Sequence, residues 1–369
     1  MTDQLERLSR LPIRENLRGL RPYGAPQIDV PILLNVNENT HGVPEDVRTA
    51  IVTAVENAVA GLNRYPDREF AMLREHLAGY LGHGLSAENI WAANGSNEVL
   101  QHILLAFGGP GRTAIGFPPT YSMYPLLAGS TGTEYLSGSR QDDFVLEARA
   151  TADQVAATGA NIVFLCSPNN PTGTALSLDV VADVYEAGAA AQAIVIVDEA
   201  YAEFAHAGTP SALELLPGRE RLIVSRTMSK AFALAGARVG YLAAAPEIAD
   251  ALRLVRLPYH LSAITQATAV AALTHSAKLL ANVDEIKRQR DRIVSGLVDL
   301  GLPVAPSDSN FVLFGGLEDP RAVWQKLLDA GVLIRDVGIP HHLRVTAGTQ
   351  QETTVFLETL KSLIRPAVS

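Results

Sequence analysis

The sequence of 369 residues contains one cysteine, Cys166, so the chain cannot form an internal disulfide bond. So little cysteine is typical of proteins in reducing compartments, and we expect a cytoplasmic location. No apolar run approaches the roughly 18 residues that a membrane-spanning helix needs, and the first residues lack the apolar core of a signal peptide. These absences predict a protein that does not act on a membrane.

Positive charge is also scarce. The chain has 30 Lys and Arg against 39 Asp and Glu, which gives a formal net charge of −9. Nucleic acids and anionic lipids bind basic surfaces, so this balance argues against both as partners. The histidines show no metal-ligand spacing and no Gly-x-Gly-x-x-Gly follows a strand pattern, so we expect neither a metal site nor a bound dinucleotide.

The apolar residues that are present form short runs. Between residues 46 and 258 these runs alternate with helical patterns, which is typical of an α/β fold with a mostly parallel sheet and helices on both faces. The runs expected to be strands are Arg112–Gly116, Asn161–Cys166, Ala193–Val197, Arg221–Val224 and Val239–Ala243.

The pattern changes after residue 258, where longer helices begin. We predict helices at Ala277–Leu300 and Asp319–Ala330 and strands at Asn310–Phe314, Val332–Arg335 and Leu343–Thr346. The sequence therefore predicts a large domain of residues 46–258 and a smaller α+β domain of residues 1–45 and 259–369. We expect a ligand cleft between the two.

The most informative side chain is Lys230. It follows Ser229 in a run of small and apolar residues, where desolvation lowers the pKa of an amine and frees its nucleophilic form. Arg238, eight positions later, and the hydroxyls of Thr227 and Ser229 suit a dianionic phosphate. An amine beside a phosphate site is the arrangement that an enzyme using pyridoxal phosphate (PLP) needs, whereas a solvated lysine at a helix start is the simpler alternative.

An acid follows the Ile/Val-rich run Ala193–Val197. This residue, Asp198, would lie at the carboxyl end of a buried strand, where open α/β sheets bind ligands. A carboxylate there would pair with the protonated ring nitrogen of PLP, and Tyr201 would reach the phenolic oxygen of the ring. The alternative is a helix N-cap.

A stiff loop follows the run Asn161–Cys166. Pro171 fixes one backbone angle and Gly173 permits unusual ones, so the loop can hold the amide of Asn170 against a ring oxygen. An ordinary turn would have the same composition.

Two further residues stand before the helical pattern Glu98–Phe107. Ser96 and Asn97 would lie where a helix start offers free N–H groups to a phosphate, a role compatible with plain helix capping.

The order of these motifs resembles one enzyme family. Asn170, Asp198 and Lys230 are separated by 28 and 32 residues, as in the fold-type I PLP-dependent aminotransferases. Further segments resemble the histidinol-phosphate aminotransferases within this family: Asn37–Asn39, Arg64–Asp67, Gly95–Glu98, Pro118–Pro125 and Ser309–Phe311. The resemblance extends from about Leu20 to the last helix.

The resemblance implies a set of cofactor contacts. Lys230, Asp198 and Tyr201 would be catalytic, and Tyr121 would stack on the pyridine ring. The residues expected to bind PLP are Ser96, Asn97, Tyr121, Asn170, Asp198, Tyr201, Thr227, Ser229, Lys230 and Arg238, with Tyr65 reaching across a two-fold interface from the partner of a homodimer.

The resemblance also implies the substrate contacts. Arg344 would bind the anionic end of the substrate with Arg335 nearby, since a guanidinium fork suits a carboxylate or a phosphate. Asn170 would contribute as well, and Tyr23 would cover the imidazole end.

The implied reaction is amino transfer between L-histidinol phosphate and 2-oxoglutarate, with imidazole-acetol phosphate and glutamate as the other pair, in histidine biosynthesis. An aromatic-amino-acid aminotransferase of the same fold and a phosphothreonine decarboxylase remain alternatives. One departure from the family pattern follows Asn39, where Thr40, His41 and Gly42 replace Pro and an aromatic residue. We expect His41 to be a loop residue near the substrate entrance.

Overall fold

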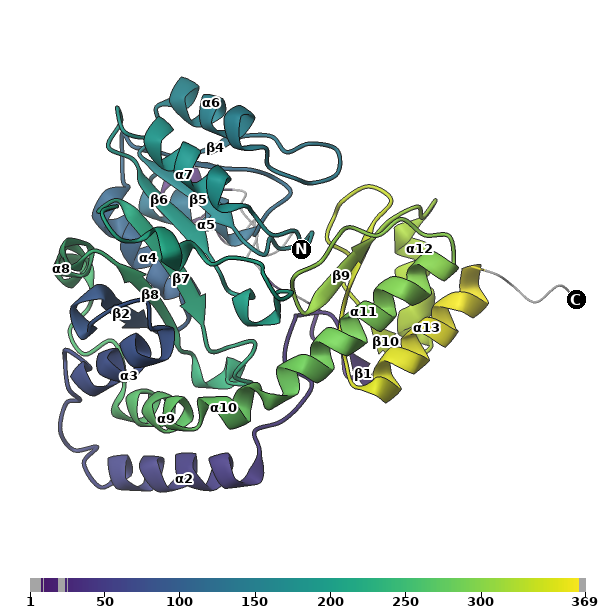
Figure 1. The fold of residues 1–369 in the computed structure, drawn as a ribbon, viewed down its shortest axis with the longest axis horizontal. Helices are drawn as coiled ribbons and strands as arrows, with labels where there is room; N and C mark the ends of the chain where they lie inside the picture. Colours follow the sequence, from purple (N-terminus) through teal and green to yellow (C-terminus); the bar gives the residue numbers. More distant parts are fainter. Residues whose placement is uncertain (1–7, 9, 19–23, 25, 365–369) are drawn as a thin grey trace, which may run out of the picture.

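The computed structural model describes residues 8, 10–18, 24 and 26–364. A large sheet with its helices forms one part of the molecule (Figure 1). In the other part, two small sheets pack beside α11 (Val283–Asp299), α12 (Pro320–Asp329) and α13 (Gln350–Ile364). None of the described helices is long and apolar enough to cross a membrane.

The large sheet has seven strands in the order β2-β8-β7-β6-β5-β3-β4. Its strands are β2 (Ile90–Ala93), β3 (Thr113–Gly116), β4 (Glu134–Ser137), β5 (Ile162–Cys166), β6 (Ile194–Asp198), β7 (Leu222–Thr227) and β8 (Gly240–Ala244). Neighbours from β4 to β7 are parallel, and only β8 pairs antiparallel with its neighbours. The prediction of a mostly parallel α/β sheet is therefore confirmed.

Two groups of helices cover this sheet. One group contains α4, α5 and α8, which pack together, and the other contains α6 and α7. These helices are α4 (Ser96–Phe107), α5 (Met123–Thr131), α6 (Ala148–Thr158), α7 (Leu178–Ala187) and α8 (Pro246–Val255). Because helices lie on both sides, every residue of the central strands β5 and β6 is buried, which explains their continuous Ile/Val-rich runs.

A second set of helices runs along the edge of the large sheet and away from it. It contains α2 (Glu45–Val59), α3 (Ala71–Leu81), α9 (Ala263–Thr274), α10 (Ser276–Leu279) and α11 (Val283–Asp299). The single helix expected at residues 277–300 is interrupted by a 3-10 turn at Leu280–Asn282. Asn282 disfavours a helix interior, and Asp284 and Glu285 favour a new helix start. Through α11 the chain reaches the small sheets (Figure 1).

The small sheets combine both ends of the chain. Strand β1 (Ile32–Leu33) pairs parallel with β10 (Val332–Leu333), and β9 (Phe311–Phe314) pairs antiparallel with β11 (Leu343–Thr346). Helices α12 (Pro320–Asp329) and α13 (Gln350–Ile364) complete this part. The expected strand 332–335 is shorter than predicted, because only an isolated bridge to Arg344 continues it at Arg335. The domain boundaries near residues 45 and 258 stay a prediction.

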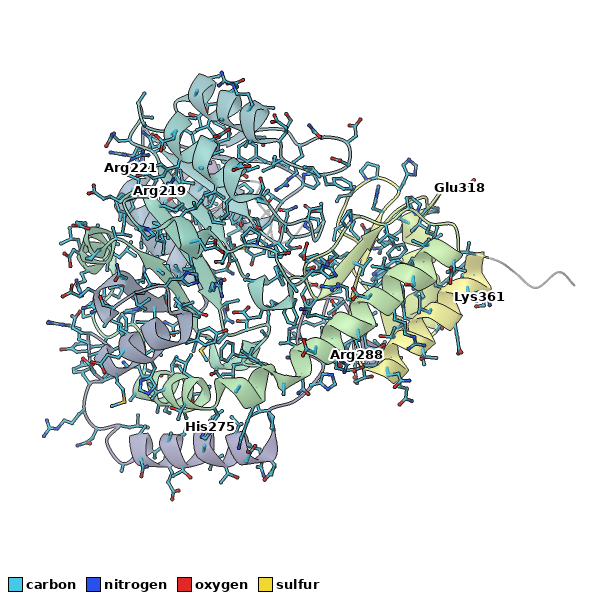
Figure 2. The ribbon with its side chains drawn as sticks, in the orientation of Figure 1. Arg219, Arg221, His275, Arg288, Glu318 and Lys361 are labelled. Atoms are coloured by element: carbon cyan, nitrogen blue, oxygen red, sulfur yellow. The ribbon has the colours of Figure 1, made fainter. Side chains whose placement is uncertain are left out.

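A buried group of ion pairs joins β7 to the segment that follows β6 in the large sheet. Arg226 of β7 contacts the carboxylate of Glu199 at 2.7 Å and that of Glu203 at 3.5 Å, and all three side chains are at most 11% exposed. Glu199 also accepts hydrogen bonds from the Ser211 hydroxyl and the Ala212 backbone. Arg288 on α11 shows the opposite placement, because its side chain is 68% exposed (Figure 2).

Strand β8 and the start of α4 approach each other so closely that a side chain would not fit between them. A Cβ atom on Gly240 would collide with the backbone of Gly95 and Ser96. Gly240→Ala should therefore lower the free energy of unfolding by about 1–3 kcal/mol, as overpacked cores do. Gly79→Ala is the control, because Gly79 lies on the exposed face of α3 with open space around it, and this change should stabilise by about 0.5–1 kcal/mol. Urea denaturation of both variants tests the contrast, and equal stability would refute it.

Candidate functional site

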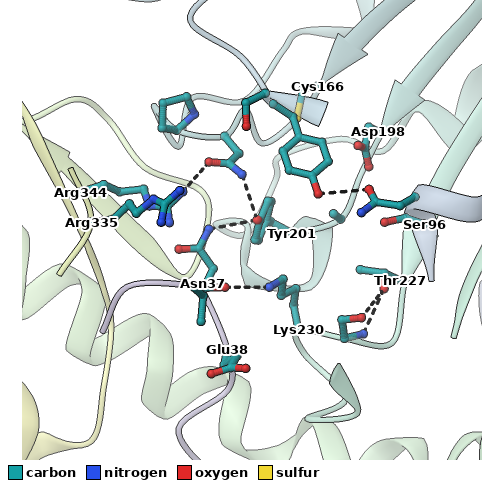
Figure 3. Close-up of a pocket in the computed structure, with 18 of the residues that line it drawn as sticks. Asn37, Glu38, Ser96, Cys166, Asp198, Tyr201, Thr227, Lys230, Arg335 and Arg344 are labelled. Atoms are coloured by element: carbon teal, nitrogen blue, oxygen red, sulfur yellow. Dashed lines mark hydrogen bonds between the residues drawn. The ribbon is translucent and has the colours of Figure 1, made fainter. Parts of the chain in front are cut away.

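A cavity of about 510 Å³ lies at the carboxyl ends of β5, β6 and β7. Residues 35–38 form one wall, and β11 with the segment after β10 forms another (Figure 3). Of the predicted site residues, twelve line this cavity: Ser96, Asn97, Tyr121, Asn170, Asp198, Tyr201, Thr227, Ser229, Lys230, Arg238, Arg335 and Arg344. Residues more than 200 positions apart in the sequence therefore meet at one place.

Lys230 lies just after β7 with its amine in the cavity (Figure 3). Its Nζ donates a hydrogen bond of 2.9 Å to the backbone carbonyl of Val36. Desolvation of the ammonium, followed by the positive charge of Arg344, lowers the pKa of Lys230 to about 8. A larger fraction of this amine than of an exposed lysine is therefore neutral, and nucleophilic, near neutral pH.

Asp198 ends β6 and is 3% exposed. Its Oδ2 accepts a hydrogen bond of 2.9 Å from the hydroxyl of Tyr124, whereas its buried Oδ1 has no hydrogen-bond partner among the described residues. Burial raises the pKa of Asp198 to about 6, although the Tyr124 hydrogen bond opposes the shift. A buried carboxylate oxygen with no donor is costly unless a ligand supplies one.

Tyr201 follows Asp198 by three residues and faces the same cavity. Its hydroxyl oxygen accepts hydrogen bonds from Nδ2 of Asn37 at 3.0 Å and from Nδ2 of Asn170 at 3.4 Å. Burial raises the pKa of Tyr201, so the hydroxyl keeps its proton at neutral pH. Figure 3 shows the side chains of Asn37 and Tyr201 meeting at this oxygen.

Opposite them, hydroxyl and guanidinium groups surround the start of α4. Thr227 donates to the Ser229 hydroxyl at 2.9 Å, and Arg238 donates to the same hydroxyl at 3.4 Å. Helix α4 begins at Ser96, two residues earlier than predicted, after Gly95 at a φ of 86°. A Cβ on Gly95 would collide with the Arg238 guanidinium, so glycine keeps this concave site open. Free N–H groups, hydroxyls and a cation make it suited to a phosphate.

Tyr121 lies beside this phosphate-like site. Its hydroxyl donates to Oδ1 of Asn97 at 3.1 Å, and its ring meets Tyr124 edge to face with centroids 5.5 Å apart. These two contacts hold the ring of Tyr121 along the cavity wall. Its predicted role, stacking on the pyridine ring of PLP, is compatible with this position and stays a prediction.

Two arginines line the opposite end of the cavity. Arg344 is 6% exposed, donates to Asn170 Oδ1 at 2.6 Å and to the Asn35 carbonyl at 2.8 Å, and lies over the ring of Phe311. Arg335 is its backbone neighbour across an isolated bridge, and Figure 3 shows the two side chains together. This end of the cavity can bind a carboxylate or a phosphate.

Two other residues that the sequence analysis singled out, Tyr65 and His41, do not line the cavity. Tyr65 is 80% exposed in the loop after α2 and stacks on Tyr259 with ring centroids 4.4 Å apart. Tyr23 lies outside the described residues. His41 has its Nε2 buried without a hydrogen-bond partner among the described residues, and it contributes nothing to the cavity wall.

Sequence reasoning missed several contributors. Asn35, Val36, Thr120 and Asp336 also line the cavity, and Tyr124 supports Asp198 from behind. For Tyr124 a signal was present, because it lies inside the segment Pro118–Pro125 that resembles the family, although its contact with Asp198 was not predicted. The contact of the Val36 carbonyl with Lys230 could not be predicted, because a backbone carbonyl is present at every residue.

Comparisons with known proteins agree with this geometry. The family described as aminotransferase class I and II matches residues 29–360. The chain is 76% identical over 364 residues to the histidinol-phosphate aminotransferase of Paenarthrobacter aurescens (strain TC1), covering 99% of this chain and 98% of the relative. It is 56% identical to the protein of the same name from Thermobifida fusca (strain YX), covering 95% of each.

A solved structure supports the same conclusion. The histidinol-phosphate aminotransferase from Sinorhizobium meliloti, determined in complex with pyridoxal-5′-phosphate, superimposes with a TM-score of 0.85 at 26% identity, covering 95% of this chain and 98% of the other. The fold class predicted from the sequence is therefore confirmed. The chain belongs to the class I and II aminotransferases and, within them, to the family of the histidinol-phosphate aminotransferases.

Proposed function

We propose that the protein is a PLP-dependent aminotransferase that transfers an amino group between L-histidinol phosphate and 2-oxoglutarate in histidine biosynthesis. The observation that carries the proposal is the presence, in one cavity, of a lysine whose pKa is lowered to about 8 and a buried carboxylate oxygen without a described partner. The relatives at 76% and 56% identity carry the name of this activity.

The residues present fit PLP. The partnerless Oδ1 of Asp198 suits the protonated ring nitrogen, because a buried carboxylate gains most from a charged donor. The start of α4 with Thr227, Ser229 and Arg238 would hold the phosphate, and the hydroxyl of Tyr201 would donate to the ring oxygen. Lys230 would hold the group covalently.

When bound, PLP supplies the electron sink that lets a substrate amine lose the proton on its α-carbon. Nζ of Lys230 takes and returns that proton, a role that its lowered pKa favours near neutral pH. The Val36 carbonyl accepts a hydrogen bond from Nζ and stabilises its protonated form. Asp198 keeps its negative charge facing the cavity because Tyr124 occupies its other oxygen.

Substrate recognition is proposed at Arg344 and Arg335. Histidinol phosphate carries a phosphate and glutamate carries a distal carboxylate, and both amino donors must use one site. A pair of guanidinium groups binds either anion, and Arg344 is preoriented by Asn170 and Asn35.

Turnover of the purified, PLP-loaded protein tests the proposal. With L-histidinol phosphate as amino donor and 2-oxoglutarate as acceptor, glutamate should form at a higher kcat/KM than with phenylalanine. Lys230→Ala should lower kcat by about 10³-fold or more, because it removes the amine that moves the proton. Lys287→Ala is the control, since Nζ of Lys287 bonds the Ala205 carbonyl and does not line the cavity; it should turn over normally.

Each contrary outcome is specific. Faster turnover of phenylalanine would assign the protein to aromatic amino acids instead. Release of carbon dioxide from phosphothreonine would indicate a decarboxylase. Near-normal turnover by folded Lys230→Ala would refute the role of this lysine.

A second prediction concerns the pH dependence of PLP capture by the apoprotein. Only the neutral amine attacks, so the capture rate should rise with pH, with a midpoint near the Lys230 pKa of about 8. Arg344→Gln removes a neighbouring positive charge, which raises that pKa and should move the midpoint upward by about 0.5–1 pH unit. Arg288→Gln, on the exposed side of α11, is the control with no shift. Stopped-flow absorbance measures the rates, and an unmoved midpoint in Arg344→Gln contradicts the coupling.

We further propose that the active form is a homodimer. Large apolar side chains are exposed along α2, α3, α8 and α9 and the loops that join them: Val52, Val59, Leu62, Met72, Leu254, Leu257 and Ile264. Helices α2 and α9 pack against each other at one edge of the molecule (Figure 1). Exposed apolar surface of this extent is typical of an interface.

Tyr65 belongs to the same region. It is 80% exposed and outside its own cavity, although the family resemblance assigns it to a cofactor phosphate. A two-fold contact is self-complementary, so Tyr65 of each subunit would complete the partner's site.

Mixing two inactive variants tests the shared site. Tyr65→Ala and Lys230→Ala should each be nearly inactive alone. After random subunit exchange, half of the dimers are mixed and each has one intact site, so about a quarter of wild-type activity should return. Lys230→Ala mixed with Asp198→Asn is the control. Under the proposal each of these changes disables the site of its own subunit, so one site of the mixed dimer lacks Lys230, the other lacks Asp198, and no activity should return. No recovery in demonstrated mixed dimers, or full activity in a monomer, would rule out the shared site.

A further inference from the structure

Asn37 lies in the wall of the cavity with all of its polar groups engaged. Its N–H donates to Oγ1 of Thr346 at 3.1 Å, and its carbonyl accepts from Nδ2 of Asn310 at 3.1 Å. Its Oδ1 accepts from the Thr346 hydroxyl at 3.1 Å, and its Nδ2 donates to the Tyr201 hydroxyl at 3.0 Å. Asn37 is 2% exposed. Thr346 of β11 and Asn310, the residue before β9, therefore fix Asn37, whose side chain ends on Tyr201.

The orientation of the Asn37 amide follows from these partners. If the amide were turned over, the Thr346 oxygen would receive two N–H groups and its own proton would lose its acceptor in Asn37. In the arrangement observed, the Thr346 proton has its acceptor and the NH₂ of Asn37 is directed at Tyr201.

The Asn170 amide is fixed in the same sense. Its oxygen accepts the 2.6 Å hydrogen bond from Arg344, and a guanidinium can only donate. The NH₂ of Asn170 must therefore face Tyr201, 3.4 Å away.

The Tyr201 hydroxyl is thus an acceptor from two amides, and both of its lone pairs are used. Its one proton has to be donated elsewhere, and Tyr201 lines the cavity. The ionisable groups that act on this hydroxyl are Arg344 of β11, Cys166 of β5 and Asp198 of β6. Lys230 lies across the same cavity.

We infer that Asn37 is a positioning residue: together with Asn170 it makes Tyr201 a fixed hydrogen-bond donor into the cavity, toward the ring oxygen of PLP. The inference rests on the proposed binding of PLP. It assigns a role to the segment before α2, which lies far in the sequence from the residues that surround the cofactor. Asn37 acts through Tyr201 and does not itself have to touch the reacting atoms.

The backbone of Asn37 offers a clean substitution. Its φ of 58° lies in the left-handed region, which glycine adopts without strain and aspartate tolerates. Asn37→Gly deletes the donor without straining the backbone. Asn37→Asp keeps the shape but can only accept, so the Tyr201 proton would turn toward it. Gln192→Gly is the matched control, because Gln192 has a φ of 50° and does not line the cavity.

The readout is the pH titration of the visible absorbance of bound PLP in the holoprotein. A hydrogen bond donated to the ring oxygen stabilises its ionised form and lowers the midpoint of this titration. Asn37→Gly should raise the midpoint by about 0.5 pH unit, and Asn37→Asp by at least as much. Gln192→Gly should leave it unchanged.

A double-variant cycle shows whether Asn37 acts through Tyr201. Tyr201→Phe should raise the midpoint more than Asn37→Gly, and adding Asn37→Gly to Tyr201→Phe should raise it no further. A shift of equal size in both backgrounds, or no shift in either Asn37 variant, overturns the inference while leaving the proposed function intact. A protein that binds no PLP at all refutes the proposed function, and this inference with it.

Discussion

Strands β5, β6 and β7 are parallel neighbours in register, so that Cys166 pairs with Asp198 and Asp198 pairs with Ser225. This register delivers the residues after each strand to one edge of the sheet. The Asn170 loop, Tyr201 and Lys230 emerge there side by side. The other walls, which are the start of α4, residues 35–38 and β11, are built against that edge. Without the common strand direction, no single cavity would collect these groups.

Cationic and acidic side chains both line the cavity. The cations are Lys230, Arg238, Arg335 and Arg344, and the acids are Glu38, Asp198 and Asp336, of which Asp198 has one oxygen already bonded to Tyr124. In a chain with a net charge of −9, four cations gathered at one cavity mark a site for anions. The same field lowers the pKa of Lys230, since burial and Arg344 both disfavour its ammonium. One arrangement of cations thus attracts anions and activates the amine.

The sequence predicted well those strands that a local pattern of apolar residues encodes. The buried strands β5 and β6 were found within one residue, because an apolar run between turn residues is unambiguous. The strand β4 was missed, since it is a half-exposed edge strand without an apolar run. The strand β2 was missed because half of its residues are alanine, which is depleted in strands. Within the site, motif residues were predicted, whereas contacts such as Lys230 to Val36 and Tyr201 to Asn37 span 194 and 164 positions and depend on how the small sheets pack.

Cys166 sits at the bottom of the cavity, fully enclosed at the end of β5. Burial, together with the negative charge of Asp198, raises the pKa of its thiol to about 12. A thiol that stays protonated reacts slowly with oxidants and alkylating reagents, so the only sulfhydryl of the chain is protected from chemical damage. It also follows that labelling of this sulfhydryl reports access to the bottom of the cavity or an opening of the sheet edge. The protein thereby contains its own single-site probe of this region.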